Sequence, residues 1–139
     1  MKKHVASAVW RGSVKEGNGT LSTRSKVLNN HPYSFKSRFG DGAGTNPDEL
    51  LAASHAGCFA MALSLILGQA GFTPDSLEVT AEVTMDPDKL ELTGSHLTLT
   101  AKIPNIDHAK FMECANEAKD NCPISKALKF PISLDATLA

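Results

Sequence analysis

Three cysteines, Cys58, Cys114 and Cys122, are the residues of this chain best suited to covalent chemistry. The nucleophilic form of cysteine is the thiolate, which a helix N-terminus or a neighbouring cation stabilises. Cys122 directly precedes Pro123, and this pair predicts the cap and the first residue of a short helix. Cys114 falls in the middle of a predicted helix without an activating neighbour. Cys122 is therefore one candidate reactive thiol, and Cys58 is the other if a helix begins shortly before it.

Arg38 and Glu49 are the charged residues that would support such a thiolate. A thiolate in a dry site needs a cation or a helix dipole, and Arg38 lies on a predicted strand ahead of the cysteines. Glu49 would hold the guanidinium through a charge-assisted, bidentate contact. Each residue also has a plain structural interpretation: Cys58 as a small buried hydrophobe, Arg38 as a solvated strand residue, and Glu49 as a helix-capping residue.

The stretch TNPDELLAASHAGCFAMALSLILGQAG, residues 45–71, predicts the long helix that carries the central cysteine. Asn46 is suited to cap this helix, Pro47 fits its first position, and Glu49 is placed to complete a capping box. Gly71 provides the stop. These signals predict both ends of the helix.

Residues 52–70 carry no charged side chain and place apolar residues on every side, which predicts a buried helix. Two arrangements remain open. A helix that runs unbroken from Pro47 puts Cys58 in its middle, whereas a second helix capped by Ser54 puts Cys58 near an N-terminus. Only the second arrangement lets the helix dipole lower the pKa of the Cys58 thiol.

A long uncharged run also fits a membrane span, which needs about 20 predominantly apolar residues. Small and polar residues dilute this run at positions 52–57, and no lysine or arginine flanks it closely. The usual orientation signal is therefore absent. We expect a core helix and no membrane partner.

Alternating apolar and polar residues predict strands on both sides of the long helix. Strand hairpins grouped on both sides of helices indicate an α+β fold, whose first three strands form an antiparallel meander. The expected strands are residues 5–13, 20–28, 33–39, 77–84, 90–103 and 132–138, and the expected further helices are residues 107–119 and a short segment that begins at Cys122–Pro123.

Composition excludes several classes of protein. The 139 residues suit one domain, and the net charge of -1 favours neither nucleic acid nor anionic membrane as a partner. One Trp and one Tyr do not make a base-stacking platform. The N-terminus lacks the long apolar segment of a signal peptide, and an odd number of cysteines does not form a secreted disulfide framework. We therefore expect a reducing, cytoplasmic location.

The runs GTNPDELLAASHAGCFAMAL (residues 44–63) and NCPISKAL (residues 121–128) resemble the OsmC/Ohr family of thiol peroxidases. The run STRSKVLNNHPYSFKSRFGDG (residues 22–42) resembles the OsmC branch in particular. His55 stands where the organic-hydroperoxide-resistance branch tends to carry tyrosine. The resemblance spans almost the whole chain, and two cysteine motifs in order are more specific than a single Cys-Pro pair.

The resemblance implies one OsmC-like domain over residues 1–139, with antiparallel sheets around a long buried central helix. Two chains would intertwine as a homodimer with two active sites at the interface. By position, Cys58 matches the peroxidatic cysteine, Cys122 the resolving cysteine, Arg38 the arginine that supports the thiolate, and Glu49 the glutamate that orients this arginine.

The activity implied by the resemblance is the reduction of organic hydroperoxides, and also of hydrogen peroxide, without metal, haem or flavin. A Cys58 sulfenic acid would condense with Cys122 to a disulfide, which a thiol reductant would reopen. Dihydrolipoyl proteins are the usual reductants in the better-known branch.

Two other functions compete with a peroxidase. His55, Cys58, Cys114 and Cys122 offer nitrogen and sulfur ligands for a metal, but their spacing matches no common zinc pattern. A non-enzymatic protein of the same fold would instead carry small apolar ligands. We interpret His55 as a hydrogen-bonded structural histidine, with tuning of the Cys58 thiolate as the alternative.

Overall fold

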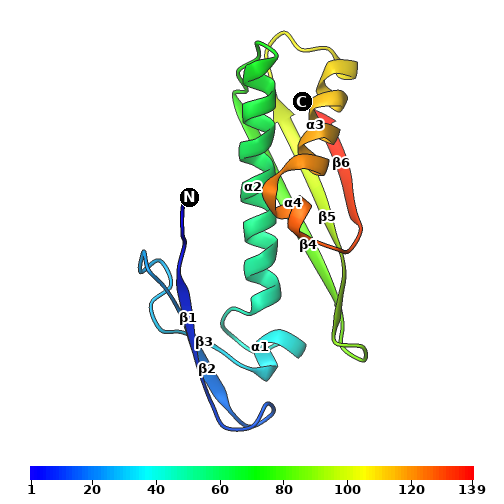
Figure 1. The fold of residues 1–139 in the computed structure, drawn as a ribbon. Helices are drawn as coiled ribbons and strands as arrows, with labels where there is room; N and C mark the ends of the chain where they lie inside the picture. Colours follow the sequence, from blue (N-terminus) through cyan, green and yellow to red (C-terminus); the bar gives the residue numbers. More distant parts are fainter. The chain divides into compact units, whose positions relative to one another are not determined.

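The computed structural model describes all of residues 1–139, which divide into two compact units, Met1–Leu50 and Leu51–Ala139. The order of the elements along the chain can be followed by colour (Figure 1). In sequence, these elements are β1 Ala6–Arg11, β2 Asn18–Thr23, β3 His31–Tyr33, α1 Phe35–Phe39, α2 Pro47–Gln69, β4 Ser76–Asp86, β5 Glu91–Lys102, α3 His108–Asn121, α4 Pro123–Ala127 and β6 Ile132–Leu138.

The first unit contains a three-stranded antiparallel sheet in the order β1-β2-β3. This confirms an antiparallel meander, but its third strand is His31–Tyr33 and not residues 33–39. Gly19 on β2 lies between Trp10 and Tyr33, whose ring centroids are 5.4 Å apart. A Cβ at Gly19 would lie 2.6 Å from the Tyr33 ring and 2.7 Å from the Trp10 ring. Only glycine therefore lets the two aromatic rings meet across this strand.

Residues 33–39 are not a strand, and the prediction for them is wrong. β3 ends at Tyr33, and Ser34 caps the short helix α1. The Ser34 N–H donates to Ser37 Oγ at 2.8 Å, and the Ser37 N–H donates to Ser34 Oγ at 3.2 Å. This reciprocal capping box starts a helix. The alternation of apolar residues arises because Phe35 and Phe39 stack one turn apart, with ring centroids 4.7 Å from each other.

The helix α2 runs unbroken for 23 residues, so Ser54 does not start a second helix. The Glu49 N–H donates to Asn46 Oδ1 at 2.8 Å, which confirms Asn46 as the cap. At the other end, Gly71 has a φ of +91°, and the Phe72 N–H donates back to the Leu67 carbonyl at 2.8 Å. This left-handed glycine closes the helix as predicted.

The second unit contains a three-stranded sheet in the order β4-β5-β6. β4 and β5 pair antiparallel, with a register shift where Thr84 faces Gly94 and Met85 faces Leu92. β6 pairs with β5 in parallel, which corrects the expectation of antiparallel sheets. The helices α3 and α4 lie between these two strands in the chain and form the long connection that parallel pairing requires.

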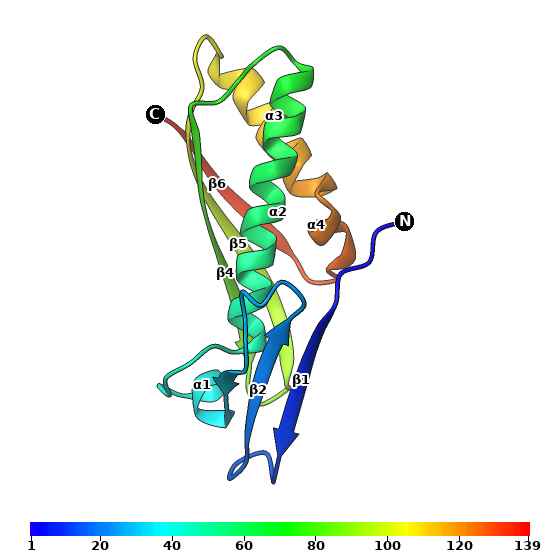
Figure 2. The same cartoon turned by 90° about the vertical axis from the view of Figure 1, so that its left-hand side faces the viewer.

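The core of the second unit lies between the sheet and its helices. The helices α2, α3 and α4 lie on one side of the sheet in both views (Figure 1 and Figure 2). Every second residue of β5 faces them, and burying one large apolar side chain contributes about 1.5–3 kcal/mol. The fully buried apolar residues are Phe59, Leu63, Leu67, Leu97, Leu99, Ala101, Phe111, Ala115, Ala118 and Cys122.

The helix α2 is buried along one stripe and exposed along the opposite one. By length and composition alone it is long and apolar enough to cross a membrane. His55, Phe59, Leu63 and Leu67 recur every fourth residue and are fully buried against the sheet, as in a core helix. On the other side Met61 is 77% exposed. Within one chain α2 is therefore buried only along the stripe that faces the sheet, and the prediction that it is buried on all sides is not met.

Candidate active site

The second unit brings Cys58 and Cys122 together at the start of α4. Cys58 lies in the middle of α2 and is partly buried, whereas Cys122 caps α4 and is fully buried. The Ile124 N–H donates to Cys58 Sγ at 3.5 Å, and the Ser125 N–H donates to Cys122 Sγ at 3.4 Å. Both thiols are free. Two sulfurs that are distant in sequence thus bind consecutive amides of one helical turn, and the predicted cap role of Cys122 is confirmed.

The surroundings of Cys58 within its own unit favour the thiol. Burial raises the pKa of Cys58, and the neighbouring Cys122 raises it further, while the hydrogen bond from the Ile124 N–H lowers it. None of these neighbours is a cation. The mid-helix position also removes the dipole assistance that a break at Ser54 would have given. A reactive thiolate at this position therefore requires a positive charge from elsewhere.

Cys114 lies apart from this pair, in the core face of α3. Burial raises the pKa of the Cys114 thiol, so it stays protonated. A buried, protonated thiol of this kind is chemically inert. The structure thus gives Cys114 a packing role.

His55 belongs to a buried row of polar groups that ends on Cys122. Its Nε2 lies 2.8 Å from Ser125 Oγ, and its Nδ1 lies 2.7 Å from Ser95 Oγ. The Cys122 thiol donates to Ser125 Oγ at 3.0 Å. Burial lowers the pKa of His55, which keeps the imidazole neutral. The interpretation of His55 as a hydrogen-bonded, buried histidine is thus confirmed. Its partners also connect it to Cys122, and this connection was not predicted from the sequence.

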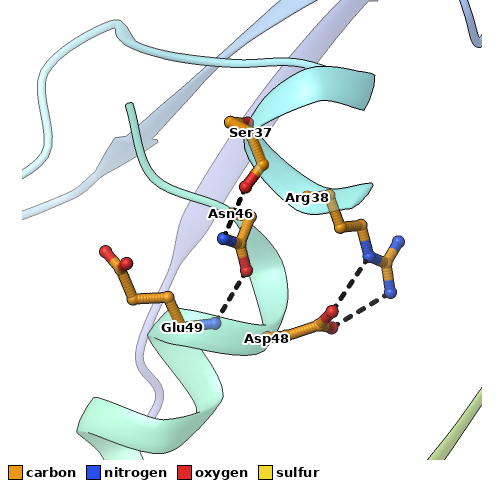
Figure 3. A network of polar contacts seen from close by, with 5 residues as sticks. All are labelled: Ser37, Arg38, Asn46, Asp48 and Glu49. Carbon is orange, nitrogen blue, oxygen red and sulfur yellow. Dashed lines mark hydrogen bonds and ion pairs between the residues drawn. The ribbon is translucent and has the colours of Figure 1, made fainter. Parts of the chain in front are cut away.

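Arg38 is held by a carboxylate in the first unit, and this carboxylate belongs to Asp48 (Figure 3). Arg38 Nη2 lies 3.1 Å from Asp48 Oδ1, and Arg38 Nε lies 3.3 Å from Asp48 Oδ2. This is the bidentate geometry expected of an arginine–carboxylate pair. Arg38 lies on α1, not on a strand. Its side chain is 37% exposed.

Glu49, the predicted partner of Arg38, has a different contact in this structure. Its carboxylate accepts a hydrogen bond from Thr45 Oγ1 at 3.1 Å. Asp48 and Glu49 both occupy the first turn of α2, where the helix dipole favours negative charge. Asn46 links this turn to α1, because its Nδ2 donates to the Ser37 carbonyl at 2.8 Å (Figure 3). The sequence analysis did not identify Asp48 as the partner of Arg38. The only hint in the sequence is that Asp48 is an acidic residue next to Glu49.

An apolar groove of about 870 Å³ opens beside Cys58 in the second unit. It follows the exposed stripe of α2 and the beginning of α4. Phe59, the next residue along α2, is in the core, whereas Met61 lines the groove. The lining residues are Ser54, Cys58, Met61, Ala62, Leu65, Ile66, Glu117, Asn121, Pro123 and Ile124.

The proposed nitrogen and sulfur ligands of a metal do not form a cluster. No group of three or more histidine, cysteine, aspartate or glutamate side chains converges on one point. Both ring nitrogens of His55 are already paired with serine hydroxyls. The metal-binding interpretation therefore has no geometric support.

This chain is similar to several known proteins. Residues 40–137 match the profile of the family described as OsmC-like protein. Peroxiredoxin OsmC of Escherichia coli (strain K12) is 47% identical over 133 residues, which cover 94% of this chain and 93% of that protein. Organic hydroperoxide resistance protein OhrB of Bacillus subtilis (strain 168) is 35% identical over 89 residues, which cover 62% of this chain and 63% of that protein.

Solved structures show the same fold. The OsmC-like protein from Mycoplasma pneumoniae matches with a TM-score of 0.75 at 18% identity, over 99% of this chain and 98% of that chain. An organic hydroperoxide resistance protein from Elizabethkingia anophelis matches with a TM-score of 0.68 at 25% identity, over 99% of this chain and 97% of that chain.

Proposed function

The chain belongs to the OsmC family, and on this premise we propose that it is a thiol-dependent peroxidase that reduces organic hydroperoxides and hydrogen peroxide. The observation that carries the proposal is the meeting of Cys58 and Cys122 at one helical turn. A sulfenic acid formed on one sulfur is within reach of a second thiol, which condenses with it before further oxidation. A binding protein for apolar ligands has no use for this pair.

In the first step, the Cys58 thiolate attacks one oxygen of the hydroperoxide. The sulfur–oxygen bond forms as the oxygen–oxygen bond breaks, and the departing alkoxide takes a proton and leaves as an alcohol. Cys58 is then a sulfenic acid. The apolar groove beside Cys58 suits the alkyl part of such a substrate.

In the second step, the sulfur of Cys122 attacks the sulfur of the Cys58 sulfenic acid. A disulfide forms, and the oxygen leaves as water. A dithiol reductant then attacks the disulfide through its own thiolate and restores both cysteines. We assign this role to a thiol reductant of the dihydrolipoyl class.

Arg38 supplies the positive charge that Cys58 lacks within its own unit. A cation near a thiol favours the charged form, and the same guanidinium stabilises the charge that develops on the leaving oxygen. We assign the orientation of this guanidinium in the reacting enzyme to Glu49. In this structure Arg38 pairs with Asp48, and the proposal requires the guanidinium to move from Asp48 to the neighbouring Glu49 in the reacting enzyme.

We further propose that the protein acts as a homodimer in the cytoplasm. The exposed stripe of α2, with Met61 at 77% and Leu65 at 63% exposure, leaves an apolar helix face uncovered in the single chain. Large apolar stripes of this kind mark protein interfaces. A second copy that covers this stripe would exclude water from the groove beside Cys58.

Mass spectrometry after one equivalent of an alkyl hydroperoxide under anaerobic conditions tests the proposed function. We expect one equivalent of alcohol and an intramolecular Cys58–Cys122 disulfide. Cys58→Ser abolishes turnover, and Cys122→Ser allows one oxidation and then stalls or over-oxidises, whereas the control Cys114→Ala behaves as the native chain. Multiple turnover by Cys58→Ser would overturn the proposal.

A further inference from the structure

A buried chain of hydrogen bonds ends on Cys122, and the mechanism above does not use it. This chain, called here the His55 chain, consists of Cys122, Ser125, His55 and Ser95. Its successive distances are 3.0 Å from Cys122 Sγ to Ser125 Oγ, 2.8 Å from Ser125 Oγ to His55 Nε2, and 2.7 Å from His55 Nδ1 to Ser95 Oγ. All four residues are buried.

The direction of the Cys122–Ser125 hydrogen bond, together with a neutral imidazole, sets the directions of the other two hydrogen bonds. When the Cys122 thiol donates to Ser125, the serine keeps its own proton for His55. Nε2 of His55 is then an acceptor, and Nδ1 carries the proton that is donated to Ser95. The result is a neutral imidazole with its free lone pair directed at the hydroxyl that receives the thiol proton.

Cys122 requires such assistance because its sulfur is enclosed. Its hydrogen-bond partners are the hydroxyl and the backbone N–H of Ser125, and neither of these groups is a base. A thiol attacks as the thiolate, and an adjacent general base is the usual means of producing it. His55 is the basic group that the hydroxyl of Ser125 connects to this thiol.

We propose that His55 is a positioning residue that acts through Ser125 to withdraw the thiol proton from Cys122 as this cysteine resolves the Cys58 sulfenic acid. The inference rests on the proposed function, because the sulfenic acid is the product of the peroxide step. It assigns a role in the second step only. The peroxide step at Cys58 proceeds without His55.

The step balances without a further oxidant or reductant. The Cys122 sulfur forms the sulfur–sulfur bond with its electron pair, and the sulfur–oxygen bond of Cys58 breaks with its pair on oxygen. The thiol proton moves to Ser125 Oγ while the serine proton moves to His55 Nε2. The leaving hydroxide takes up one proton and departs as water, and His55 gives up its extra proton to return to the neutral form. The Cys122 sulfur is oxidised and the Cys58 sulfur is reduced.

Disulfide closure can be measured without any peroxide in a Cys114→Ala background. One equivalent of dipyridyl disulfide attaches a thiopyridyl group to the more accessible Cys58, and attack by Cys122 then releases a second coloured thione. We expect Ser125→Ala and His55→Gln to slow this release about tenfold or more, within the usual range for general-base assistance. Ser125→Thr, which keeps the hydroxyl, restores the rate. His55→Gln keeps a hydrogen-bond acceptor but removes the base.

The matched control is His96→Gln. His96 pairs with Ser133 Oγ at 2.6 Å through Nδ1, as His55 pairs with Ser95, but it has no link to Cys122. We expect disulfide closure in His96→Gln to be as fast as in the parent. Equal closure rates in the parent and in folded His55→Gln would overturn the inference. If Ser125→Ala does not fold, the closure rates of Ser125→Thr and His55→Gln test the inference by themselves. Closure should then be fast in Ser125→Thr and slow in His55→Gln.

The peroxide reaction separates this inference from the proposed function. With one equivalent of alkyl hydroperoxide, His55→Gln should release alcohol at the parent rate and form the disulfide slowly. Suppose that His55→Gln closes slowly in the dipyridyl assay but the parent does not react with hydroperoxide. That result would overturn the proposed function and leave the link between His55 and Cys122 in place.

Discussion

The backbone N–H of Ile124 lies 3.5 Å from the sulfur of Cys58, although the two residues are 66 positions apart in the chain. This contact brings the middle of α2 to the first turn of α4, where Cys122 is the cap. One amide hydrogen bond does not offset the burial that raises the pKa of Cys58. The activation of Cys58 therefore depends on a cation, which leads to the first prediction.

Arg38→Ala should shift the reactivity of Cys58 to higher pH. Loss of an opposite charge near a thiol raises its pKa by about one unit or more, and only the thiolate reacts. The alkylation rate at neutral pH should therefore fall roughly tenfold, and the profile of rate against pH should move upward. Alkylation by iodoacetamide across pH measures this shift. Lys36→Ala, which removes a cation from the same helix, is the control, and an unchanged profile in Arg38→Ala would refute the role.

Glu49→Gln and Asp48→Asn distinguish the two carboxylates of the first turn of α2. If Glu49 orients the guanidinium during the reaction, Glu49→Gln should lower the rate with hydroperoxide about tenfold, because a misplaced cation stabilises the thiolate less. Asp48→Asn should change this rate less than threefold, because in this proposal Asp48 does not orient the guanidinium during the reaction. Stopped-flow rates decide between them. A larger effect of Asp48→Asn would assign the orienting role to the carboxylate that holds Arg38 in this structure.

Met61→Glu or Leu65→Glu should convert the proposed homodimer to monomers. A carboxylate on the exposed stripe of α2 would be buried without a partner in the dimer, at a cost of several kcal/mol. Sedimentation velocity measures the change in mass. Leu90→Glu is the matched control, because Leu90 is also exposed, at 73%, but lies at the turn between β4 and β5. A native chain that sediments as a monomer would contradict the prediction.

His55 should make the stability of the fold decline in mild acid. Its pKa in the folded chain lies below the ordinary value of 6.5, so the unfolded chain binds the proton first as the pH falls. The free energy of unfolding should therefore decrease as the pH drops below about 6.5, by up to about 1.4 kcal/mol for each unit of pKa depression. Urea unfolding at a series of pH values measures this slope. His55→Gln should flatten it, and an equal slope in His55→Gln and the parent would contradict the prediction.

The sequence was sufficient for features that depend on near neighbours in the chain. Asn46 and Gly71 mark the two ends of α2, and Cys122 with Pro123 marks the start of α4, because caps act through hydrogen bonds within a few residues. Cys58 and Cys122, which the family resemblance paired, meet at one helical turn in the fold. The α+β class and the first two strands of the meander also follow from patterns that are local along the chain.

The tertiary structure decided what depends on distant partners. Seven residues that alternate in polarity fit a strand as well as a short helix, and only the reciprocal bonds of Ser34 and Ser37 select the helix. Residues 132–138 were recognised as a strand, but its parallel pairing with β5 depends on the path of α3 and α4. Local pattern carries no information about the direction in which two strands meet.

The partners of the functional side chains were likewise beyond the sequence. Asp48 and Glu49 are adjacent acids on one turn, and the position of α1 determines which of them contacts Arg38. His55 reaches Ser95 across 40 positions and Ser125 across 70 positions, and no pattern of spacing predicts a contact over such a separation. Sequence thus determined which groups are able to react, because chemistry belongs to the residue. Folding determined which groups meet, because contact belongs to the packed core.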